Sequence, residues 1–464
     1  MPCLLSLLRR GSRARPNAYG LATPDGVEHI PGGPDFTSLS GTAAIGYRLI
    51  KTSPLDNPQP ILDAGHATSF IGRLWDSPSP TAVFDTLRSD AKNGLEKMLH
   101  NEDGSWAAAV VEEERIICAR DVIGAVPLYY GQNEEYAAVA NNKKTFVALG
   151  VTPTRVPPGH IVTLSLNGLE DEAITTLENP PTSTFDLEEA TDRLNQLLTK
   201  AASRTALNQT TPTLAFSGGI DSTLLAYYLK GVGLHLHLTC VGSTESPDLE
   251  AAEVAADSLC LPLTIKTYTE TDLDEHLDQI LFSVEEADPM KIGVATPLYF
   301  VAKEASSRSN SVIYSGNGSD ELFGGYAKYA ELYQKDEREA VASMFRDVLR
   351  SHEVNLERDW KVCSDLGLEL RLPFIDPSLT RFALGLPPQY KLPKDGKEPR
   401  KIILRHLAKR LGFPPAVSGR PKKAAQYSSG TGKMIERLAK RSGKSVPGFL
   451  SGRLEEAMRR IEQG

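Results

Sequence analysis

Apolar segments alternate with helix-forming segments after residue 212, and this alternation restricts the possible folds more than any other feature of the chain. Apolar runs predict strands at 213–216, 236–241, 264–268 and 311–314. Residues at helical spacing predict helices at 222–231, 247–260 and 295–307. Strands that alternate with helices form a parallel sheet with helices on both faces. The sequence therefore predicts an α/β fold for this part of the chain.

A polar segment with two adjacent prolines, at residues 177–186, separates this part from the preceding one. A helix is predicted directly after it, because Asp186 is a candidate N-cap and Glu189 stands at the capping-box spacing. Before the segment, apolar runs are short and strand-like. We therefore expect two domains, residues 1–180 and residues 181–464.

Two features of the first domain predict strands. The apolar runs at 106–111 and 115–119 flank a charged turn, as in a hairpin. The apolar run at 1–8 is followed by arginines, whereas a signal peptide carries its charge before the apolar run. This run therefore predicts a buried first strand rather than a targeting segment.

The charge balance narrows the class of protein. The chain has 464 residues, with 51 Lys and Arg against 59 Asp and Glu, and a net charge of −8. This mild acidity argues against a protein that coats nucleic acid. The apolar runs are much shorter than the ~18–20 residues of a membrane helix. Residues 400–464 are basic, with 16 Lys and Arg and 4 Asp and Glu, and we interpret 433–460 as a solvated helical face.

Cysteine usage predicts the compartment. The chain has five cysteines, an odd number, and the sequence contains no CxxC. This pattern argues against a disulfide framework and against a zinc ribbon. We expect a cytoplasmic protein.

Residues 217–222, Ser-Gly-Gly-Ile-Asp-Ser, follow a predicted strand and open a predicted helix. Glycines let the backbone approach phosphate oxygens, and the N–H groups at a helix start favour an anion. Ser217 and Ser222 add hydroxyl donors. Asp221 would repel phosphates unless a cation intervenes, and Mg²⁺ suits that place. The segment predicts a phosphate-binding loop, with a glycine-rich turn capped by Asp221 as the alternative.

This loop resembles the pyrophosphate loop SGGxDS of ATP pyrophosphatases, which split ATP to AMP and pyrophosphate. Residues 315–326, Ser-Gly-Asn-Gly-Ser-Asp-Glu-Leu-Phe-Gly-Gly-Tyr, resemble SGEGSDELFGGY of the asparagine synthetases and the related β-lactam synthetases. Other family-like segments follow in family order, at 246–249, 296–297, 367–376 and 400–405. The resemblance covers residues 187 to about 430. It implies a parallel-sheet, HUP-like ATP pyrophosphatase domain with synthetase activity.

The resemblance also implies roles by position. Asp221 and Asp320 match the aspartates that hold Mg²⁺ on the phosphates. Lys401 matches a lysine that stabilises negative charge as the adenylate forms, with a surface lysine as the alternative. Glu369 is a candidate for handling protons or orienting the attacking amine, with an ion pair to Arg371 as the alternative. The implied ATP-binding residues are Phe216, Ser217, Gly218, Gly219, Asp221, Ser222, Val241, Ser315 and Gly316.

One position departs from the family. Asn317 stands where asparagine synthetases usually have Glu in SGEG. A neutral amide cannot act as a base, but it can orient groups by hydrogen bonding. The departure bears on the carboxylate substrate more than on the phosphate chemistry.

Residues 1–180 resemble the amino-terminal-nucleophile (Ntn) glutaminase domain that precedes the synthetase domain in this family. The resemblance rests chiefly on Ala119–Gly131, close to ARDxxGxxPLYY, and on the turn Pro158–His160. It implies an α+β Ntn-hydrolase-like sandwich in front of the α/β domain.

Two departures predict that this glutaminase site is inactive. The reaction uses a cysteine at the mature amino terminus, and removal of Met1 would leave Cys3 inside the chain. The family segment FNGEIYN appears as residues 70–76, with Ile71 in place of the amide donor and Arg73 in place of the acid.

These observations predict an ATP- and Mg²⁺-dependent, asparagine synthetase-like ligase that forms an amide through an acyl-adenylate. The expected substrates are a small carboxylate, with aspartate suspected, and ammonia or an amine rather than glutamine. A β-lactam-synthetase-like ligase acting on another carboxylate is one alternative. A non-catalytic ATP-binding regulatory or scaffold protein is another. Membrane and nucleic-acid partners are not expected, and a homodimer remains an option.

Overall fold

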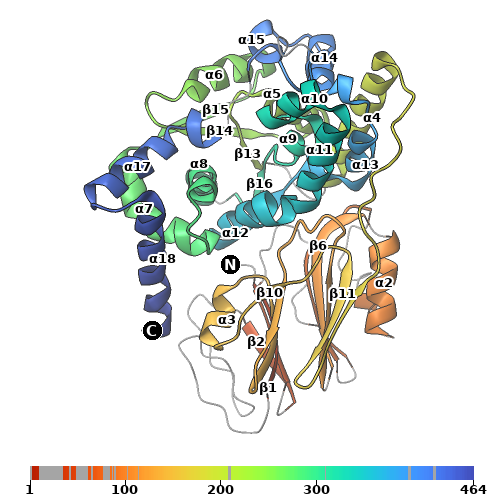
Figure 1. The fold of residues 1–464 in the computed structure, drawn as a ribbon, viewed down its shortest axis with the longest axis vertical. Helices are drawn as coiled ribbons and strands as arrows, with labels where there is room; N and C mark the ends of the chain where they lie inside the picture. The colour runs from red at the N-terminus through yellow and green to blue at the C-terminus, as the bar shows by residue number, and fades with distance from the viewer. Residues whose placement is uncertain are drawn as a thin grey trace.

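The computed structural model describes residues 3–9, 35–40, 43–48, 61–63, 66–76, 84–85, 87, 90–101, 103–112, 114–206, 211–308, 310–394, 399–421 and 425–463. Antiparallel sheets form one part of the molecule, and a parallel sheet among helices forms the other (Figure 1). The chain passes between them after β12, Leu169–Ala173, and before α4, Leu187–Thr205. The expected fold class, an α/β part preceded by an α+β sandwich, is confirmed. The domain bounds at residues 180 and 181 stay a prediction.

The first part contains two six-stranded sheets, and the described strands of both pair in antiparallel fashion. One has the order β10-β8-β9-β1-β3-β2, from Thr154–Arg155, Tyr129–Gln132, Tyr136–Ala140, Cys3–Arg9, Ala43–Arg48 and Asp35–Ser40. The other has the order β12-β11-β7-β6-β5-β4, from Leu169–Ala173, His160–Ser165, Arg115–Arg120, Gly104–Val111, His66–Leu74 and Ile61–Asp63. The predicted first strand and the predicted β6–β7 hairpin are confirmed.

Both faces of β6 are buried, which explains its unbroken apolar sequence. Ala107 and Ala109 belong to the core that also includes Val139 of the opposite sheet. Trp106 and Ala108 belong to the core on the other face, under helix α2, Ala91–Asn101. The sheets therefore pack as a sandwich with α2 on its outer face (Figure 1).

The second part is built on one five-stranded sheet whose strands are all parallel. Its order is β15-β14-β13-β16-β17, from Leu263–Thr267, His237–Gly242, Thr213–Ala215, Val312–Tyr314 and Glu369–Arg371. The four predicted strands are confirmed, and β17 is a fifth. The chain leaves β13 toward one edge and returns to its other side at β16. Ligands of such sheets bind outside the carboxyl ends of the strands at this switch point.

The predicted helices are confirmed as α4, α5 (Ile220–Gly231), α6 (Pro247–Leu259) and α8 (Pro289–Ser307). Asp186 and Glu189 form the expected capping box of α4. Helix α8 begins before the predicted residue 295, because Asp288 caps it and Pro289 occupies its first turn. The other helices are α3 Lys144–Ala148, α7 Glu270–Val284, α9 Ser319–Phe323, α10 Ala327–Lys335, α11 Glu337–Ser351, α12 Glu357–Asp365, α13 Pro377–Leu384, α14 Ile402–Arg410, α15 Pro415–Ser418, α16 Ala425–Ser428, α17 Thr431–Arg441 and α18 Val446–Gln463. Three short turns are a π-helical turn at His352–Leu356 and 3₁₀ turns at Pro373–Ile375 and Pro388–Tyr390.

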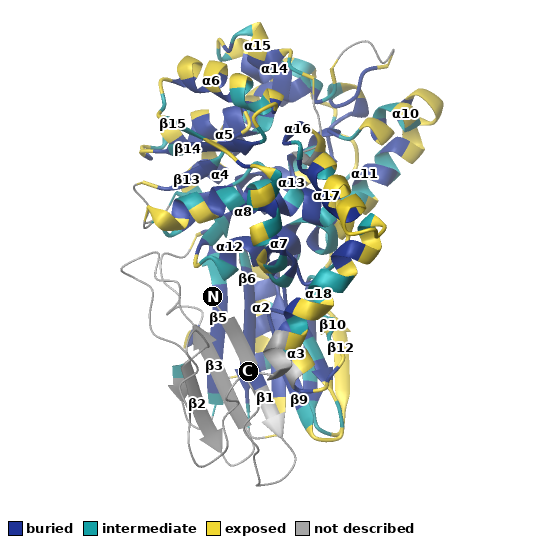
Figure 2. Cartoon of the chain, turned by 90° about the vertical axis from the view of Figure 1, so that its left-hand side faces the viewer, coloured by how far each residue is buried: buried dark blue, intermediate teal, exposed yellow. Residues whose placement is uncertain are grey.

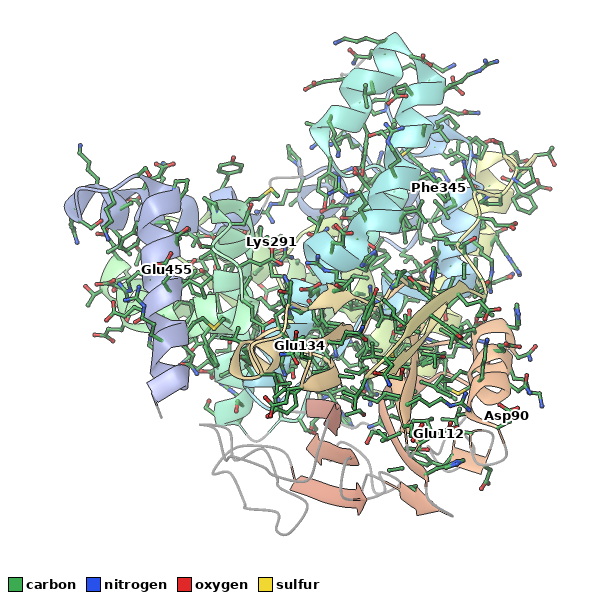
Figure 3. All side chains as sticks on the ribbon, turned by 60° about the horizontal axis from the view of Figure 1, so that its bottom comes forward. Asp90, Glu112, Glu134, Lys291, Phe345 and Glu455 are labelled. Atoms are coloured by element: carbon green, nitrogen blue, oxygen red, sulfur yellow. The ribbon has the colours of Figure 1, made fainter. Side chains whose placement is uncertain are left out.

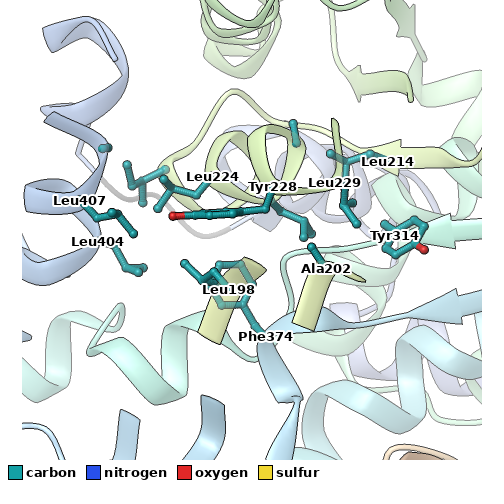
Figure 4. Close-up of a cluster of buried hydrophobic side chains, with 14 of the residues drawn as sticks. Leu198, Ala202, Leu214, Leu224, Tyr228, Leu229, Tyr314, Phe374, Leu404 and Leu407 are labelled. Atoms are coloured by element: carbon teal, nitrogen blue, oxygen red, sulfur yellow. The ribbon is translucent and has the colours of Figure 1, made fainter. Parts of the chain in front are cut away.

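The apolar core of the second part holds the strand and the helix on either side of the glycine loop. Figure 4 shows Tyr228 of α5 among side chains from β13, α4, α5 and α14. These side chains include Leu214, Leu198, Leu224, Leu229, Leu404 and Leu407, and all are buried. The loop between β13 and α5 is thus fixed at both ends.

The junction between the two parts is polar and buried. Helix α12 lies between them in Figures 1 and 2. Lys361 of α12 places Nζ 2.6 Å from Glu285 Oε2 and 2.7 Å from Glu357 Oε1. From the first part, Arg155 donates to Glu357 at 2.8 Å and the Tyr129 hydroxyl also donates to Glu357. Each of these charged groups therefore has a counter-charge across or beside the junction.

The basic segment 433–460 lies on helices α17 and α18. We expected its charges to face solvent, but some of them form ion pairs with acidic residues of helix α7. Arg453 contacts Asp274 at 2.7 Å and also Asp278, and Arg441 lies 2.6 Å from Glu270, all on the acidic helix α7. Figure 3 shows Glu455 of α18 on the outside of the molecule. Of the helices described, none has the length and apolar character of a membrane span.

Candidate active site

The glycine loop takes the shape that its sequence predicts. Strand β13 ends at Ala215, and α5 begins at Ile220 after Gly219. Gly218 has φ +64°, and a Cβ there would lie 2.2 Å from the carbonyl oxygen of Ala251, so only glycine fits. The Ser222 hydroxyl donates to the Gly219 carbonyl at 3.2 Å. The start of α5 therefore faces the switch point with a backbone suited to an anion.

Lys401, Asp221 and Asp320 come together from three separate segments. Lys401 Nζ lies 2.6 Å from Asp221 Oδ2 and 2.6 Å from Asp320 Oδ1. The Ser319 hydroxyl lies 3.2 Å from the same Nζ and donates to Asp221 Oδ1 at 2.8 Å. The lysine is 0% exposed, which excludes the alternative of a surface lysine. Three of the residues singled out from the sequence thus form one cluster.

The backbone around this cluster is specialised. Lys401 itself adopts a left-handed conformation, with φ 64°, directly before α14. Its N–H donates to the Lys391 carbonyl at 2.8 Å, which holds the turn. Gly325 lies against the cluster: a Cβ there would be 1.8 Å from Asp320 Oδ1 and 2.6 Å from Lys401 Cε. Glycine at this position is what allows the carboxylate and the lysine to meet.

A cavity of about 860 Å³ opens beside the cluster. Its size lies within the range of small-molecule sites. Among its lining residues are the predicted Phe216, Ser217, Asp221, Ser222, Val241, Ser315, Gly316 and Asp320. Three other predicted residues lie beside this wall but do not line the cavity: Gly218, Gly219 and Lys401. The structure therefore brings together the predicted nucleotide-binding positions at one cavity.

Glu369 is placed differently from the other predicted residues. It is not among the residues that line the large cavity; it borders a separate cavity of about 70 Å³ at the junction of the two parts. Its carboxylate lies 2.8 Å from Arg371 Nε and 3.0 Å from Arg73 Nη2. Burial would raise the pKa of Glu369, but Arg371 and Arg73 outweigh it and lower the pKa below its ordinary range. The ion pair left open from the sequence is present, and the proton-handling role stays a prediction.

Asn317, the departure from the family pattern, contacts a carboxylate. Its Nδ2 donates to Asp359 Oδ2 at 2.6 Å, and its Oδ1 accepts from the Gly318 N–H at 2.7 Å. Asp359 also accepts from Arg358 Nε at 2.7 Å. Asn317, Arg358 and Asp359 all line the large cavity. A carboxylate therefore stands on this wall, but it belongs to Asp359.

Sequence reasoning missed a second group on the cavity wall. Glu321, Tyr326 and Asn355 line the cavity, and Glu321 Oε1 accepts from Tyr326 at 2.5 Å and from Asn355 at 2.6 Å. Burial and then Asp320 raise the pKa of Glu321. Glu321 and Tyr326 lie inside the second motif, so the motif itself was the available signal. Asn355 comes from the π-helical turn, which carries no sequence signal, although such turns often occur at functional sites.

The carboxylate pair fits what Mg²⁺ requires. Mg²⁺ is commonly held by one or two carboxylates, with substrate phosphates and waters as its other ligands. Asp221 and Asp320 converge on one point, now held by the ammonium group of Lys401, beside the helix start that would bind phosphates. Groups of three or more acidic, His or Cys side chains suited to a metal do not occur among the residues that the structure describes.

Comparisons with known proteins show which families the chain resembles. The family model "Asparagine synthase" matches residues 193–342 and 333–448, and the model "Glutamine amidotransferase domain" matches residues 72–148. "Putative asparagine synthetase (glutamine-hydrolyzing) 1" of Methanocaldococcus jannaschii is 31% identical over 414 residues, 77% of this chain and 76% of the relative. Asparagine synthetase (glutamine-hydrolyzing) of Rattus norvegicus is 27% identical over 79% of this chain and 70% of its own. Asparagine synthetase (glutamine-hydrolyzing) 2 of Oryza sativa is 27% identical over 71% of this chain and 58% of its own.

Solved structures resemble the chain more distantly. The glutamine phosphoribosylpyrophosphate amidotransferase of B. subtilis, complexed with ADP and GMP, has a TM-score of 0.30 at 16% identity, covering 57% of this chain and 65% of its own. The NH3-dependent NAD synthetase of Campylobacter jejuni has a TM-score of 0.27 at 16% identity, covering 61% of this chain and 97% of its own.

Proposed function

The chain belongs to the asparagine synthase family, and on this premise we propose that it joins a carboxylate to ammonia or an amine through an acyl-adenylate, with ATP and Mg²⁺. Membership makes it a carbon–nitrogen ligase that uses ATP. The metal, the nitrogen donor and the carboxylate substrate are the parts proposed here, as are the roles of individual residues.

One observation carries the proposal: the buried ammonium group of Lys401 lies 2.6 Å from each of two convergent aspartates, beside a glycine loop at a helix start. A positive charge in a desolvated position stabilises negative charge far better than one in water. When Mg²⁺ and ATP bind, Asp221 and Asp320 would hold the metal, which supplies charge neutralisation on the phosphates. The Lys401 ammonium group would then be released from its aspartates and directed at phosphate oxygens.

The other residues on the cavity wall orient the nucleotide. Phe216, Val241, Ser315 and Gly316 would line the adenine and ribose, and Ser217, Gly218, Gly219 and Ser222 would cradle the phosphates. A substrate carboxylate oxygen then attacks the α-phosphorus, and pyrophosphate departs with the electron pair of the broken P–O bond. An amine lone pair attacks the acyl carbon, the C–O bond to AMP breaks, and the protons of the amine leave to solvent or phosphate.

We propose that the nitrogen does not come from glutamine. Arg73 occupies the position of the family acid in the glutamine-binding segment, and its guanidinium group is engaged with Glu369 of the second part. Ile71, on the same strand, is buried and has no polar side chain with which to stabilise an oxyanion. Two functions of a glutaminase site are therefore filled by side chains that cannot perform them.

We also propose which carboxylate the enzyme uses as its substrate. Aspartate is the substrate that the family suggests, and Asn317 with Asp359 replaces the glutamate expected on the cavity wall. A negative charge, on Asp359, therefore lies beside position 317 on the cavity wall. Aspartate therefore stays the first candidate, with other small amino acids next.

A pyrophosphate-release assay with a panel of carboxylates tests the proposal. Aspartate with ATP, Mg²⁺ and ammonium should release pyrophosphate and form asparagine, and glutamine should not replace ammonium. Activity with glutamine alone would contradict the nitrogen assignment. Failure of every carboxylate, with ATP binding retained, would instead favour a regulatory protein that binds ATP.

A further inference from the structure

Glu321 is a buried carboxylate with one oxygen left without a hydrogen bond. The residue is 3% exposed and lines the large cavity. Its Oε1 accepts from Tyr326 and Asn355, whereas Oε2 has no partner among the described residues. A buried polar atom without a partner is costly, and native structures contain few of them. The orphaned oxygen therefore marks a place where something else supplies a donor.

The cation that acts on this carboxylate, Lys401, is already paired with two other acids. The neighbouring charges are Asp320, of like sign, and Lys401, whose ammonium group is already shared between Asp221 and Asp320. Among the described residues, no lysine, arginine or histidine nitrogen is paired with Glu321. Its two side-chain hydrogen-bond donors are a neutral phenol and a neutral amide, and its own backbone N–H adds a third neutral donor.

The donors around Glu321 are fixed in direction. Arg358 Nη1 donates to Asn355 Oδ1 at 3.1 Å, which turns the NH₂ group of Asn355 toward Glu321 Oε1. Tyr326 directs its hydroxyl proton to the same oxygen. An amide NH₂ group and a donating hydroxyl are poor metal ligands, because Mg²⁺ needs oxygen lone pairs around it. A primary ammonium group, which has three N–H donors and no acceptor, suits the free Oε2.

We infer that Glu321 Oε2 binds a primary ammonium group, R–NH₃⁺ or NH₄⁺, of a substrate in the large cavity. This inference rests on the proposed function, since it assigns part of that same site. The position of Glu321 next to Asp320 places the ammonium group near the phosphates. Two sources share this chemistry: the ammonium ion that supplies the nitrogen, and the amino group of the carboxylate substrate.

Calorimetric titration without ATP tests the inference directly, with wild type and Glu321→Gln. L-Aspartate and succinate differ by the amino group alone, so the ratio of their affinities reports its recognition. In the wild type, aspartate should bind about 10- to 100-fold more tightly than succinate if its amino group is the ligand, as a charged hydrogen bond provides. The Gln variant should then lose this preference. Glu331→Gln, at an exposed position of α10, is the matched control and should keep it.

Ammonium chloride provides the second arm. If the ammonium ion is the ligand, Glu321→Gln should weaken its binding in the same titration about 10- to 100-fold while the aspartate-to-succinate ratio is unchanged. A loss in either arm supports the inference. An unchanged response in both arms overturns it, and so does a selective rise in the Mg²⁺ requirement. Because the titrations need no turnover, they decide the inference even if the wild type releases no pyrophosphate.

Discussion

Arg73 and Glu369 stand 296 positions apart in the sequence, and their side chains form a two-point ion pair across the junction of the two parts. Arg73 Nε and Nη2 lie 3.2 and 3.0 Å from the carboxylate oxygens, and both side chains are less than one fifth exposed. A residue of strand β5 in the first part therefore contacts the edge strand of the parallel sheet in the second part. The contact gives the first part a structural role that does not depend on glutamine chemistry.

Replacing Arg73 should weaken the fold. Arg73→Met removes one of the charges that offset the buried Glu369 carboxylate, so the free energy of unfolding should fall by about 1–3 kcal/mol, measured by chemical denaturation. Arg346→Met is the control, since its ion pair with Glu339 is about half exposed and should contribute less than about 1 kcal/mol. Equal losses in the two variants would contradict a special role for the junction pair.

Replacing Lys401 should remove adenylation. Lys401→Met keeps the length of the side chain but loses the charge, and the rate of pyrophosphate release should fall about 100- to 1000-fold. Lys409→Met, at an exposed position on the same helix, should leave the rate unchanged. A fall of less than tenfold in the Lys401 variant would argue against the proposed role.

Metal removal tests the paired carboxylates. A chelator should stop pyrophosphate release, and added Mg²⁺ should restore it. Asp221→Asn and Asp320→Asn should each raise the Mg²⁺ concentration for half-maximal activity about 10- to 100-fold, since each removes a proposed ligand. Asp257→Asn, an exposed acid of α6, should not change that concentration. A Mg²⁺ dependence that stays the same in both variants would refute the assignment.

The contact between Asn317 and Asp359 can be tested by adding a negative charge at position 317. Asn317→Asp places a second carboxylate where the amide now donates to Asp359 at 2.6 Å, and the repulsion should cost about 1–2 kcal/mol of unfolding free energy. Asp359→Asn, added to this variant, should recover part of the loss. A double-mutant cycle measures the coupling, and a coupling near zero would show that the two side chains act independently.

His352 should make stability depend on pH. Burial, and then the charge of Arg120, lower the pKa of His352 to about 3, and Arg120 Nη2 donates to His352 Nδ1 at 3.1 Å. The unfolded chain therefore binds more protons than the folded chain once the pH falls below the ordinary histidine value of about 6.5. Stability is full above that pH and should decrease by about 2 kcal/mol by about pH 5, at ~1.4 kcal/mol per pH unit.

His352→Gln should flatten this part of the stability curve, as measured by denaturation at several pH values. Carboxylates held as ions, such as Glu369 and Glu357, add their own acid sensitivity at lower pH, because their pKa values are lowered. A histidine variant with the wild-type slope between about pH 6.5 and 5 would show that another group controls it.

Local patterns predicted much of the fold. The strands of the parallel sheet, the glycine loop after β13 and the capping box at Asp186 all depend on residues close in sequence, so spacing was enough to find them. Strand β17, Glu369–Arg371, has one apolar residue between two charged ones, so it forms no apolar run that would predict a strand. The β6 run was recognisable because a strand buried on both faces is apolar throughout.

The site was predicted in part for the same reason. Motif matching selected Asp221, Asp320 and Lys401, which do meet, and it could not indicate that Arg73 reaches Glu369 from another part of the chain. That contact depends on how the two parts of the molecule pack against each other, which no local pattern encodes. The orphaned oxygen of Glu321 was hidden similarly, because a missing partner becomes visible only when every neighbour has been placed.

Lys401, seated between two aspartates, has a practical consequence for handling the protein. The lysine acts as an internal counter-ion, so the two acids do not depend on nucleotide or metal to offset their mutual repulsion. Protein purified in buffers without ATP or magnesium should remain folded during storage.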